Sequence, residues 1–163
     1  MNTSTLVGQF REAMAGVATP VSIVTTLCDG RPHGSTVSAF LSLSMEPALL
    51  LVSLHKQSKL LDLIRTSNRF GLNVLGVGQR DIAAAFAKRA DDKFNGVRWQ
   101  SRQGVPRLYD VSGWVACVVD DVIDAGDHRI IIGNVIEADS ADRPPLTYHR
   151  RVFGTHTTLT AAS

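Results

Sequence analysis

The sequence has little of what marks several large classes of protein. Its 163 residues carry a formal net charge of only +2, so it lacks the basic surface that drives nucleic-acid binding. Its longest apolar run, residues 48–52, is far too short to cross a bilayer. The N-terminus has no charged segment followed by an apolar one, so no signal peptide is expected. These absences predict a cytoplasmic protein that binds neither nucleic acid nor a membrane.

Metal-binding patterns are also missing. The two cysteines, Cys28 and Cys117, lie far apart inside apolar segments, and neither a CxxC nor an HExxH pattern occurs. The five histidines share no spacing typical of metal ligands. A buried free cysteine behaves as a small hydrophobic residue, and this is the interpretation we favour for both. We therefore expect no metal ion.

The length and composition indicate one domain over residues 1–163, with its core between about residues 10 and 154. Near the N-terminus, apolar residues recur at steps of four, four and three: Leu6, Phe10, Met14 and Val17. This spacing predicts a helix over residues 5–18 with one apolar face. We expect that face to pack on the core and to close one end of the fold.

Beyond this helix the pattern changes to that of strands, in which apolar or β-branched segments alternate with turns that contain glycine or proline. We expect strands at residues 21–27, 33–38, 48–54, 69–75, 111–125 and 128–138, and helices at residues 58–65 and 78–87. Residues 39–46 are predicted to form a polar connection, and residues 91–110 are predicted to be mostly loop. About six or seven strands, mostly joined as hairpins, predict a mainly β fold: a small, Greek-key-like antiparallel barrel with a few peripheral helices.

The strand predicted at residues 111–125 is apolar on both faces. Val115 and Cys117 share one face, while Trp114 and Ala116 share the other. A strand of this kind is covered on both sides. One cover is expected to be the barrel interior. The other is either a helix or a second subunit, and we favour a homodimer.

Two segments combine strand ends with polar residues. Residues 34–44 place small hydroxyl side chains where large ones usually pack, which lets a flat ligand approach the backbone; the alternative is an edge strand with local hydrogen bonds. Residues 53–59 join a strand to a helix, where Ser58 and Lys59 at a helix N-terminus suit a phosphate. The alternative there is a plain helix cap with a solvated lysine.

Two further segments lie toward the C-terminus. The tight turn at residues 125–129 presents the His128 imidazole to a neighbouring pocket, although an exposed histidine in a Gly-Asp turn is also common. Residues 145–154 mix aromatic rings with guanidinium groups, which suits an anionic nucleotide; the alternative is solvated basic residues. No GxGxxG motif of a Rossmann nucleotide site occurs. Taken singly, these segments indicate only a β-barrel domain.

Several short motifs occur together in one order. They are Phe10-Arg11-Glu12-Ala13-Met14, Ala18-Thr19-Pro20-Val21, Val24-Thr25-Thr26, Ser38-Ala39-Phe40, Ser42-Leu43-Ser44, Pro47, Gly126-Asp127-His128, and Pro145-Leu146 through Tyr148. In this order they resemble the short-chain flavin reductases that serve as the reductase component of two-component flavin-dependent monooxygenases, over about residues 10–154. One departure is Ala48, where that family often has a second proline.

The resemblance implies an FMN-binding split barrel that is usually homodimeric. Such a protein reduces FMN or FAD with NAD(P)H and releases the reduced flavin to a separate monooxygenase. Hydride transfer between two cofactors needs no protein nucleophile, which agrees with the absence of an obvious catalytic triad. Because no residue cluster for a 2′-phosphate is evident, NADH is favoured over NADPH. The alternatives are a flavin- or haem-binding split-barrel protein without reductase turnover and, third, a flavin-dependent oxidase.

The resemblance also implies roles for individual residues. Contact with the isoalloxazine edge is implied for Ser35, Thr36, Val37, Ser38 and Ala39. Contact with the ribityl chain and phosphate is implied for Ser53, Leu54, Ser58 and Lys59, and a place near the flavin tail for Lys93 and Phe94. The implied catalytic residue is His128, which borders the nicotinamide in a pocket completed by Tyr148, Arg150 and Arg151.

Overall fold

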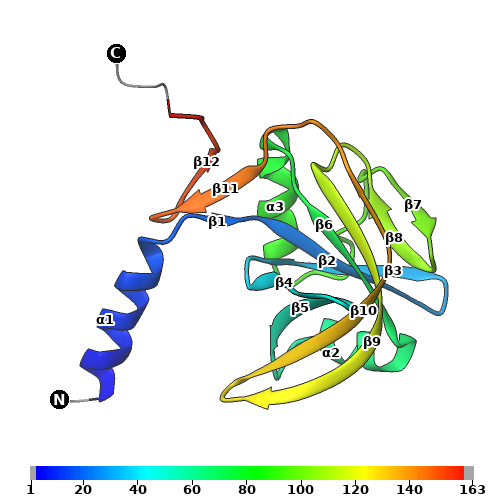
Figure 1. Ribbon diagram of the computed structural model, residues 1–163, viewed down its shortest axis with the longest axis horizontal. Helices are drawn as coiled ribbons and strands as arrows, with labels where there is room; N and C mark the ends of the chain where they lie inside the picture. Colours follow the sequence, from blue (N-terminus) through cyan, green and yellow to red (C-terminus); the bar gives the residue numbers. More distant parts are fainter. Residues whose placement is uncertain (1–2, 160–163) are drawn as a thin grey trace.

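The computed structural model describes residues 3–159 and is built mainly from β-strands (Figure 1). In chain order its elements are α1 (Thr3–Ala15), β1 (Thr19–Pro20), β2 (Ser22–Cys28), β3 (Arg31–Val37), β4 (Phe40–Met45), β5 (Ala48–His55), α2 (Lys59–Ser67), β6 (Arg69–Val74), the 3-10 helix η1 (Val77–Gln79), α3 (Arg80–Ala87), β7 (Trp99–Arg102), β8 (Val105–Leu108), β9 (Gly113–Ala125), β10 (His128–Ser140), β11 (Leu146–His149) and β12 (Val152–Thr155). The predicted mainly β fold with a few helices is confirmed. Within residues 3–159, no helix combines the length and the apolar character needed to pass through a membrane.

Seven strands form one antiparallel sheet in the order β3-β2-β6-β9-β10-β5-β4. The two edge strands of this sheet, β3 and β4, follow each other directly in the chain. β3 also approaches β5, the neighbour of the opposite edge. The sheet is therefore curled, and one of its faces encloses a core.

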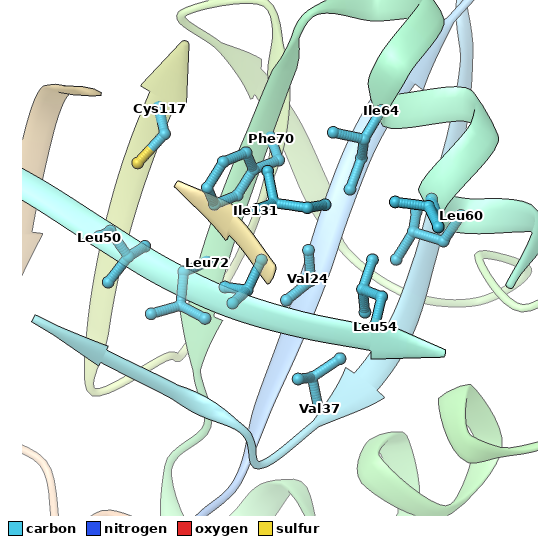
Figure 2. Close-up of a cluster of buried hydrophobic side chains, with 12 residues drawn as sticks. Val24, Val37, Leu50, Leu54, Leu60, Ile64, Phe70, Leu72, Cys117 and Ile131 are labelled. Carbon is cyan, nitrogen blue, oxygen red and sulfur yellow. The ribbon is translucent and has the colours of Figure 1, made fainter. Parts of the chain in front are cut away.

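The enclosed face carries the first of two apolar cores, which α2 covers (Figure 2). Its buried residues are Val24, Val37, Leu50, Val52, Leu54, Leu60, Leu61, Ile64, Phe70, Leu72, Cys117 and Ile131. Gly133 on β10 crosses directly over the Phe70 ring. A Cβ atom at position 133 would lie 2.6 Å from that ring, so only glycine allows this close packing.

A second core lies on the other face of β9, where Trp114 and Ala116 pack with residues of α3 and of a β7–β8 hairpin. The prediction that residues 91–110 are mostly loop was therefore wrong for β7 and β8. Both faces of β9 are apolar and covered in its first half, as predicted. The second cover is a hairpin and a helix of the same chain, so β9 gives no argument for a second subunit.

A buried polar network fixes the β7–β8 hairpin to the main sheet. The Asn73 Nδ2 donates to the carbonyls of Ile23 and Pro106, at 3.2 and 3.3 Å. Its Oδ1 accepts from the Leu108 N–H at 2.8 Å. The Thr25 hydroxyl donates to the same Pro106 carbonyl at 2.7 Å. Because these buried groups satisfy one another, the network holds β8 in one register against β2 and β6.

The segment predicted as a polar connection at residues 39–46 forms strand β4 instead. β4 pairs with β5, with a register shift between Ser42 and Ser44. Most of its side chains are exposed, including Leu41 and Met45. Strand propensity largely reflects side-chain packing, and this serine-rich edge strand packs few side chains. The composition of β4 therefore did not indicate a strand.

α1 stands beside the main sheet together with the small sheet of β1, β11 and β12, and we call these four elements the arm (Figure 1). The predicted helix is confirmed, but it ends earlier, at Ala15, and its predicted packing is wrong. No residue of α1 is buried, and Phe10 is 66% exposed. Contacts between α1 and the β11–β12 turn include a hydrogen bond from the Arg150 N–H to the Ala15 carbonyl (2.8 Å) and an ion pair of Glu12 with Arg151.

The two cysteines are free thiols that differ in environment. Cys117 is buried in the first core, and burial raises the pKa of its thiol to about 12. Cys28 ends β2 and is half-buried. The interpretation as a small buried hydrophobic residue is confirmed for Cys117 and only in part for Cys28.

Candidate functional site

A cavity of about 540 Å³ opens between β3, the end of β5, the start of α2 and the segment that follows α3. Its volume lies in the range of small-molecule sites in proteins. Its lining residues are Pro32, His33, Gly34, Ser35, His55, Gln57, Ser58, Lys59, Leu60, Leu63, Ala87, Lys88, Arg89, Ala90, Asp91, Lys93 and Phe94. Three stretches that are far apart in the sequence, within residues 32–35, 55–63 and 87–94, thus supply one site.

The cavity is strongly basic. The basic residues that line it are Lys59, Lys88, Arg89 and Lys93, and among the described lining residues the only carboxylate is that of Asp91. α2 begins at Lys59, and its N-cap residue Ser58 makes no side-chain capping bond, so the serine hydroxyl is not committed to the helix. A helix N-terminus with adjacent cations attracts anions. This end of the cavity therefore suits a phosphate.

Lys93 is anchored at the cavity wall. Its Nζ donates to the carbonyls of Gly34 (3.2 Å) and Phe86 (3.0 Å), and burial lowers the pKa of the ammonium. Position 34 has to be glycine, because a Cβ atom there would lie 2.9 Å from the Phe86 ring. Phe94 packs edge-on against that ring at 4.9 Å. Lys93 thus presents a fixed positive charge beside an aromatic wall.

An ion pair spans the basic part of the cavity. The Lys59 Nζ donates to Asp91 Oδ1 at 2.8 Å, and this bond and the lysine charge lower the pKa of the Asp91 carboxyl. The pKa of His33 is also lowered, first by burial and then by the charge of Lys59. At neutral pH, Asp91 is therefore ionised and His33 is uncharged.

Two histidines meet at the other side of the cavity. His55 ends β5 and lines the cavity, and its Nδ1 accepts from the Gln57 N–H at 3.1 Å. Opposite it in the β5–β10 register, His128 packs edge-on, with the ring centroids 5.3 Å apart. The His128 Nδ1 lies 2.7 Å from Asp127 Oδ1. His128 therefore adjoins the cavity through His55 and is not part of its lining.

The structure brings together part of the predicted flavin-binding set. The predicted residues that line the cavity are Ser35, Ser58, Lys59, Lys93 and Phe94. Thr36 faces α3 and donates its hydroxyl to the Ala83 carbonyl at 2.7 Å. Val37 and Leu54 point into the first core. These three side chains are thus committed to packing or to hydrogen bonds within the fold.

The remaining predicted flavin contacts lie between β3 and β4 or on β5. Ser38 and Ala39 form the exposed link between the two edge strands. The Ser53 N–H on β5 donates to the Ala39 carbonyl at 2.9 Å. This link follows β3, and Ser35 on β3 lines the cavity.

The predicted nicotinamide residues divide into two places. His128 lies at the β9–β10 turn, whereas Tyr148, Arg150 and Arg151 belong to the arm. The Tyr148 ring packs on Phe153 at 5.1 Å. Arg150 and Arg151 form the β11–β12 turn with φ angles of +47° and +66°. Within one chain, no described contact joins these three residues to His128 or to the cavity.

Sequence reasoning missed several lining residues. They are His33, His55, Gln57, Lys88, Arg89 and Asp91. His55 and Gln57 lie within the polar segment 53–59 that joins a strand to a helix, so their place between Ser53 and Ser58 was an available signal. His33 lies on β3, directly before the predicted segment 34–44. Lys88, Arg89 and Asp91 approach only because α3 turns the chain back over β3, and no residue spacing in the sequence indicates that turn.

Taken together, the structure shows a mainly β protein of split-barrel type with a basic cavity at one end of α2. A family model, that of the flavin reductase like domain, matches residues 14–157. The chain belongs to this family, as the ordered motifs predicted.

Curated relatives agree with this family. The chain is 39% identical over 142 residues to a Rhizobium meliloti protein described as "Probable flavin reductase", covering 86% of this chain and 46% of that protein. It is 38% identical to the reductase component of 4-nitrophenol 4-monooxygenase/4-nitrocatechol 2-monooxygenase of Rhodococcus opacus, a match that covers 90% of this chain and 79% of that protein. It is 36% identical to NADH:riboflavin 5'-phosphate oxidoreductase of Streptomyces pristinaespiralis, a match that covers 94% of this chain and 90% of that protein. The chain thus spans about half the length of the Rhizobium relative and most of the other two.

A solved structure also resembles the whole chain. It is nitrilotriacetate monooxygenase component B from Mycobacterium thermoresistibile, with a TM-score of 0.92 and 30% identity. The match covers 99% of this chain and 94% of the other. The arm and the curled sheet therefore recur together in a solved relative.

Proposed function

We propose that this chain is an NAD(P)H:flavin oxidoreductase that acts as a single domain over residues 1–163. It reduces FMN or FAD, with NADH as the preferred donor, and supplies the reduced flavin to a separate monooxygenase in the cytoplasm. The observation that carries this proposal is the basic cavity, because it joins a helix N-terminus and fixed cations to an apolar wall. The relatives named as reductase components and as an NADH-dependent oxidoreductase support it.

The lining residues fit a flavin by their chemistry. Leu60, Leu63 and Phe94 supply apolar surface, and the hydroxyls of Ser35 and Ser58 supply hydrogen-bonding groups. The basic residues at the start of α2 and after α3 match an anionic phosphate. When bound, the flavin supplies the hydride acceptor, so the protein has to bind and align the two cofactors.

We propose that His128 positions the nicotinamide at the side of the cavity that His55 lines. Its bond to Asp127 fixes the orientation of the imidazole, as a positioning role requires. His128→Ala is expected to raise the KM for NADH more than it lowers kcat, which steady-state kinetics with NADH and FMN would measure. A fall in kcat with an unchanged KM would contradict this role.

We propose that the active form is a homodimer in which α1 of one chain packs on the other. α1 exposes a continuous apolar stripe, formed by Leu6, Phe10 and Met14, and β4 exposes Leu41, Leu43 and Met45. An isolated helix of this length is marginal in water, and apolar surface of this kind marks an interaction site. Light scattering should give twice the chain mass for the purified protein, and Phe10→Glu should reduce the measured mass to that of one chain.

NADH oxidation at 340 nm, measured with and without added FMN or FAD, tests the proposed activity. We expect a rate that depends on the added flavin, because the flavin is a substrate that leaves after reduction. Tight flavin binding without NADH oxidation would instead favour a binding protein. No binding of any flavin would overturn the proposal altogether.

A further inference from the structure

The basic cavity already holds an anion that belongs to the chain. The Asp91 carboxylate accepts the hydrogen bond of Lys59, the first residue of α2, at 2.8 Å. The charge of Lys93 also acts on it. Asp91, in the segment after α3, therefore lies beside the start of α2, where the ligand phosphate would bind.

We propose that Asp91 is an internal competitor for the ligand phosphate, and that it selectively weakens the binding of phosphorylated flavins relative to riboflavin. This inference rests on the proposed function, because it concerns the same cavity. A phosphate monoester carries close to two negative charges at neutral pH. To bind Lys59, it has to displace the Asp91 carboxylate or share the lysine with it.

The strength of the pair suits such a competition. Both partners are largely exposed, with 69% and 90% of their side-chain surfaces accessible, and exposed ion pairs contribute little stability. A phosphate dianion at a helix N-terminus can therefore displace the Asp91 carboxylate. The displaced carboxylate nevertheless stays close by and repels the phosphate. The result is a lower affinity for the phosphorylated flavin, which favours its release after reduction.

Asp91→Asn tests this proposal by removing the competing charge while keeping the size of the side chain. Asp81→Asn is the matched control: it removes the same charge from another exposed aspartate that is paired with a basic residue, Arg80, outside the cavity lining. FMN and riboflavin are titrated into each protein by fluorescence quenching at low and high salt. Riboflavin reports any effect that does not depend on the phosphate.

We expect Asp91→Asn to bind FMN about two- to five-fold more tightly than the parent, with riboflavin binding unchanged. High salt should shrink this difference, and Asp81→Asn should not reproduce it. In a Lys59→Ala background the gain for FMN should largely disappear, because the two side chains act through each other.

Three results would overturn the inference. They are unchanged or weaker FMN binding in Asp91→Asn, an equal gain for riboflavin, and an equal gain in Asp81→Asn. Each of these leaves the proposed reductase activity standing, provided that the parent still binds flavin and oxidises NADH. If the parent binds no flavin, the proposed function fails first, and the inference fails with it.

Discussion

The curled sheet and the helix α1 of the arm differ in how they place their apolar residues. The sheet buries them in two cores on either side of β9. The arm leaves the apolar stripe of α1 exposed, with no buried residue in the helix. The periodicity of the sequence is equally clear in both regions. A repeating apolar pattern therefore predicts that an element has an apolar face, but it does not identify the surface that covers that face.

The polar contacts of the two regions also differ in their exposure to solvent: those of the sheet are more buried than those of the arm. On the side of the sheet, Arg107 of the β7–β8 hairpin pairs with Asp139 of β10 where both side chains are mostly shielded from solvent, and the Asn73 network is buried. In the arm, Glu12 and Arg151 pair where both side chains are mostly exposed. The sheet is thus specified by its own contacts, while the arm keeps surfaces and charges that a second molecule can use.

Two phenylalanines give the sharpest test of this difference. Phe70 is fully buried in the first core, whereas Phe10 on α1 is 66% exposed. Phe70→Ala should lower the free energy of unfolding by about 3–5 kcal/mol, because it leaves a cavity in a packed core. Phe10→Ala should leave the unfolding of the isolated chain almost unchanged. Urea denaturation at low protein concentration measures both.

Protein concentration is the control for this pair of variants. If α1 packs on a second copy, Phe10→Ala destabilises the protein only at concentrations where the parent is dimeric, because dimer stability depends on concentration. An equally large loss for Phe10→Ala at every concentration would show that the arm is packed by its own chain, and the contrast between the two regions would fail.

A smaller effect is expected from hydrogen bonds in the two regions. Asn73→Ala leaves the buried Leu108 N–H without its acceptor and should cost about 1–3 kcal/mol. Thr19→Ala removes an exposed bond in the arm, from the Thr19 hydroxyl to the Tyr148 carbonyl at 3.4 Å, and should have little effect. Thermal unfolding followed by circular dichroism compares them. Equal losses would contradict the assignment of the Asn73 network as the contact that holds the β7–β8 hairpin.

Much of the fold could be predicted because its main elements carry local signals. The turn around Gly30 indicates the β2–β3 hairpin, and Gly126 between two long apolar strands indicates the β9–β10 hairpin. β4 and the β7–β8 hairpin were missed because β4 is rich in serine and β7 alternates only weakly. The Gln103-Gly104 turn, with both φ angles positive, was a usable hairpin signal.

The candidate site could be predicted only where it follows a local motif. Ser58 and Lys59 were found because a strand leads directly into a helix there. Arg89 and Asp91 were missed because they reach the cavity through the path of the chain after α3, which depends on Phe86 packing over Gly34. A contact that long-range packing creates leaves no periodic trace in the sequence. For the same reason, the sequence could not predict that the nicotinamide residues divide between the sheet and the arm.

The last comparison asks whether the arm only supports the fold or also binds the nicotinamide cofactor. Arg151→Gln and Glu12→Gln break the same ion pair, so a purely structural role predicts equal effects. If Arg151 of one chain binds the anionic cofactor beside His128 of the other, Arg151→Gln alone should raise the KM for NADH, by about two- to five-fold for one exposed charge. Glu12→Gln should leave that KM unchanged or lower it, because it frees the guanidinium. Steady-state kinetics at fixed FMN measures both variants, and equal KM values would assign Arg151 to support of the arm.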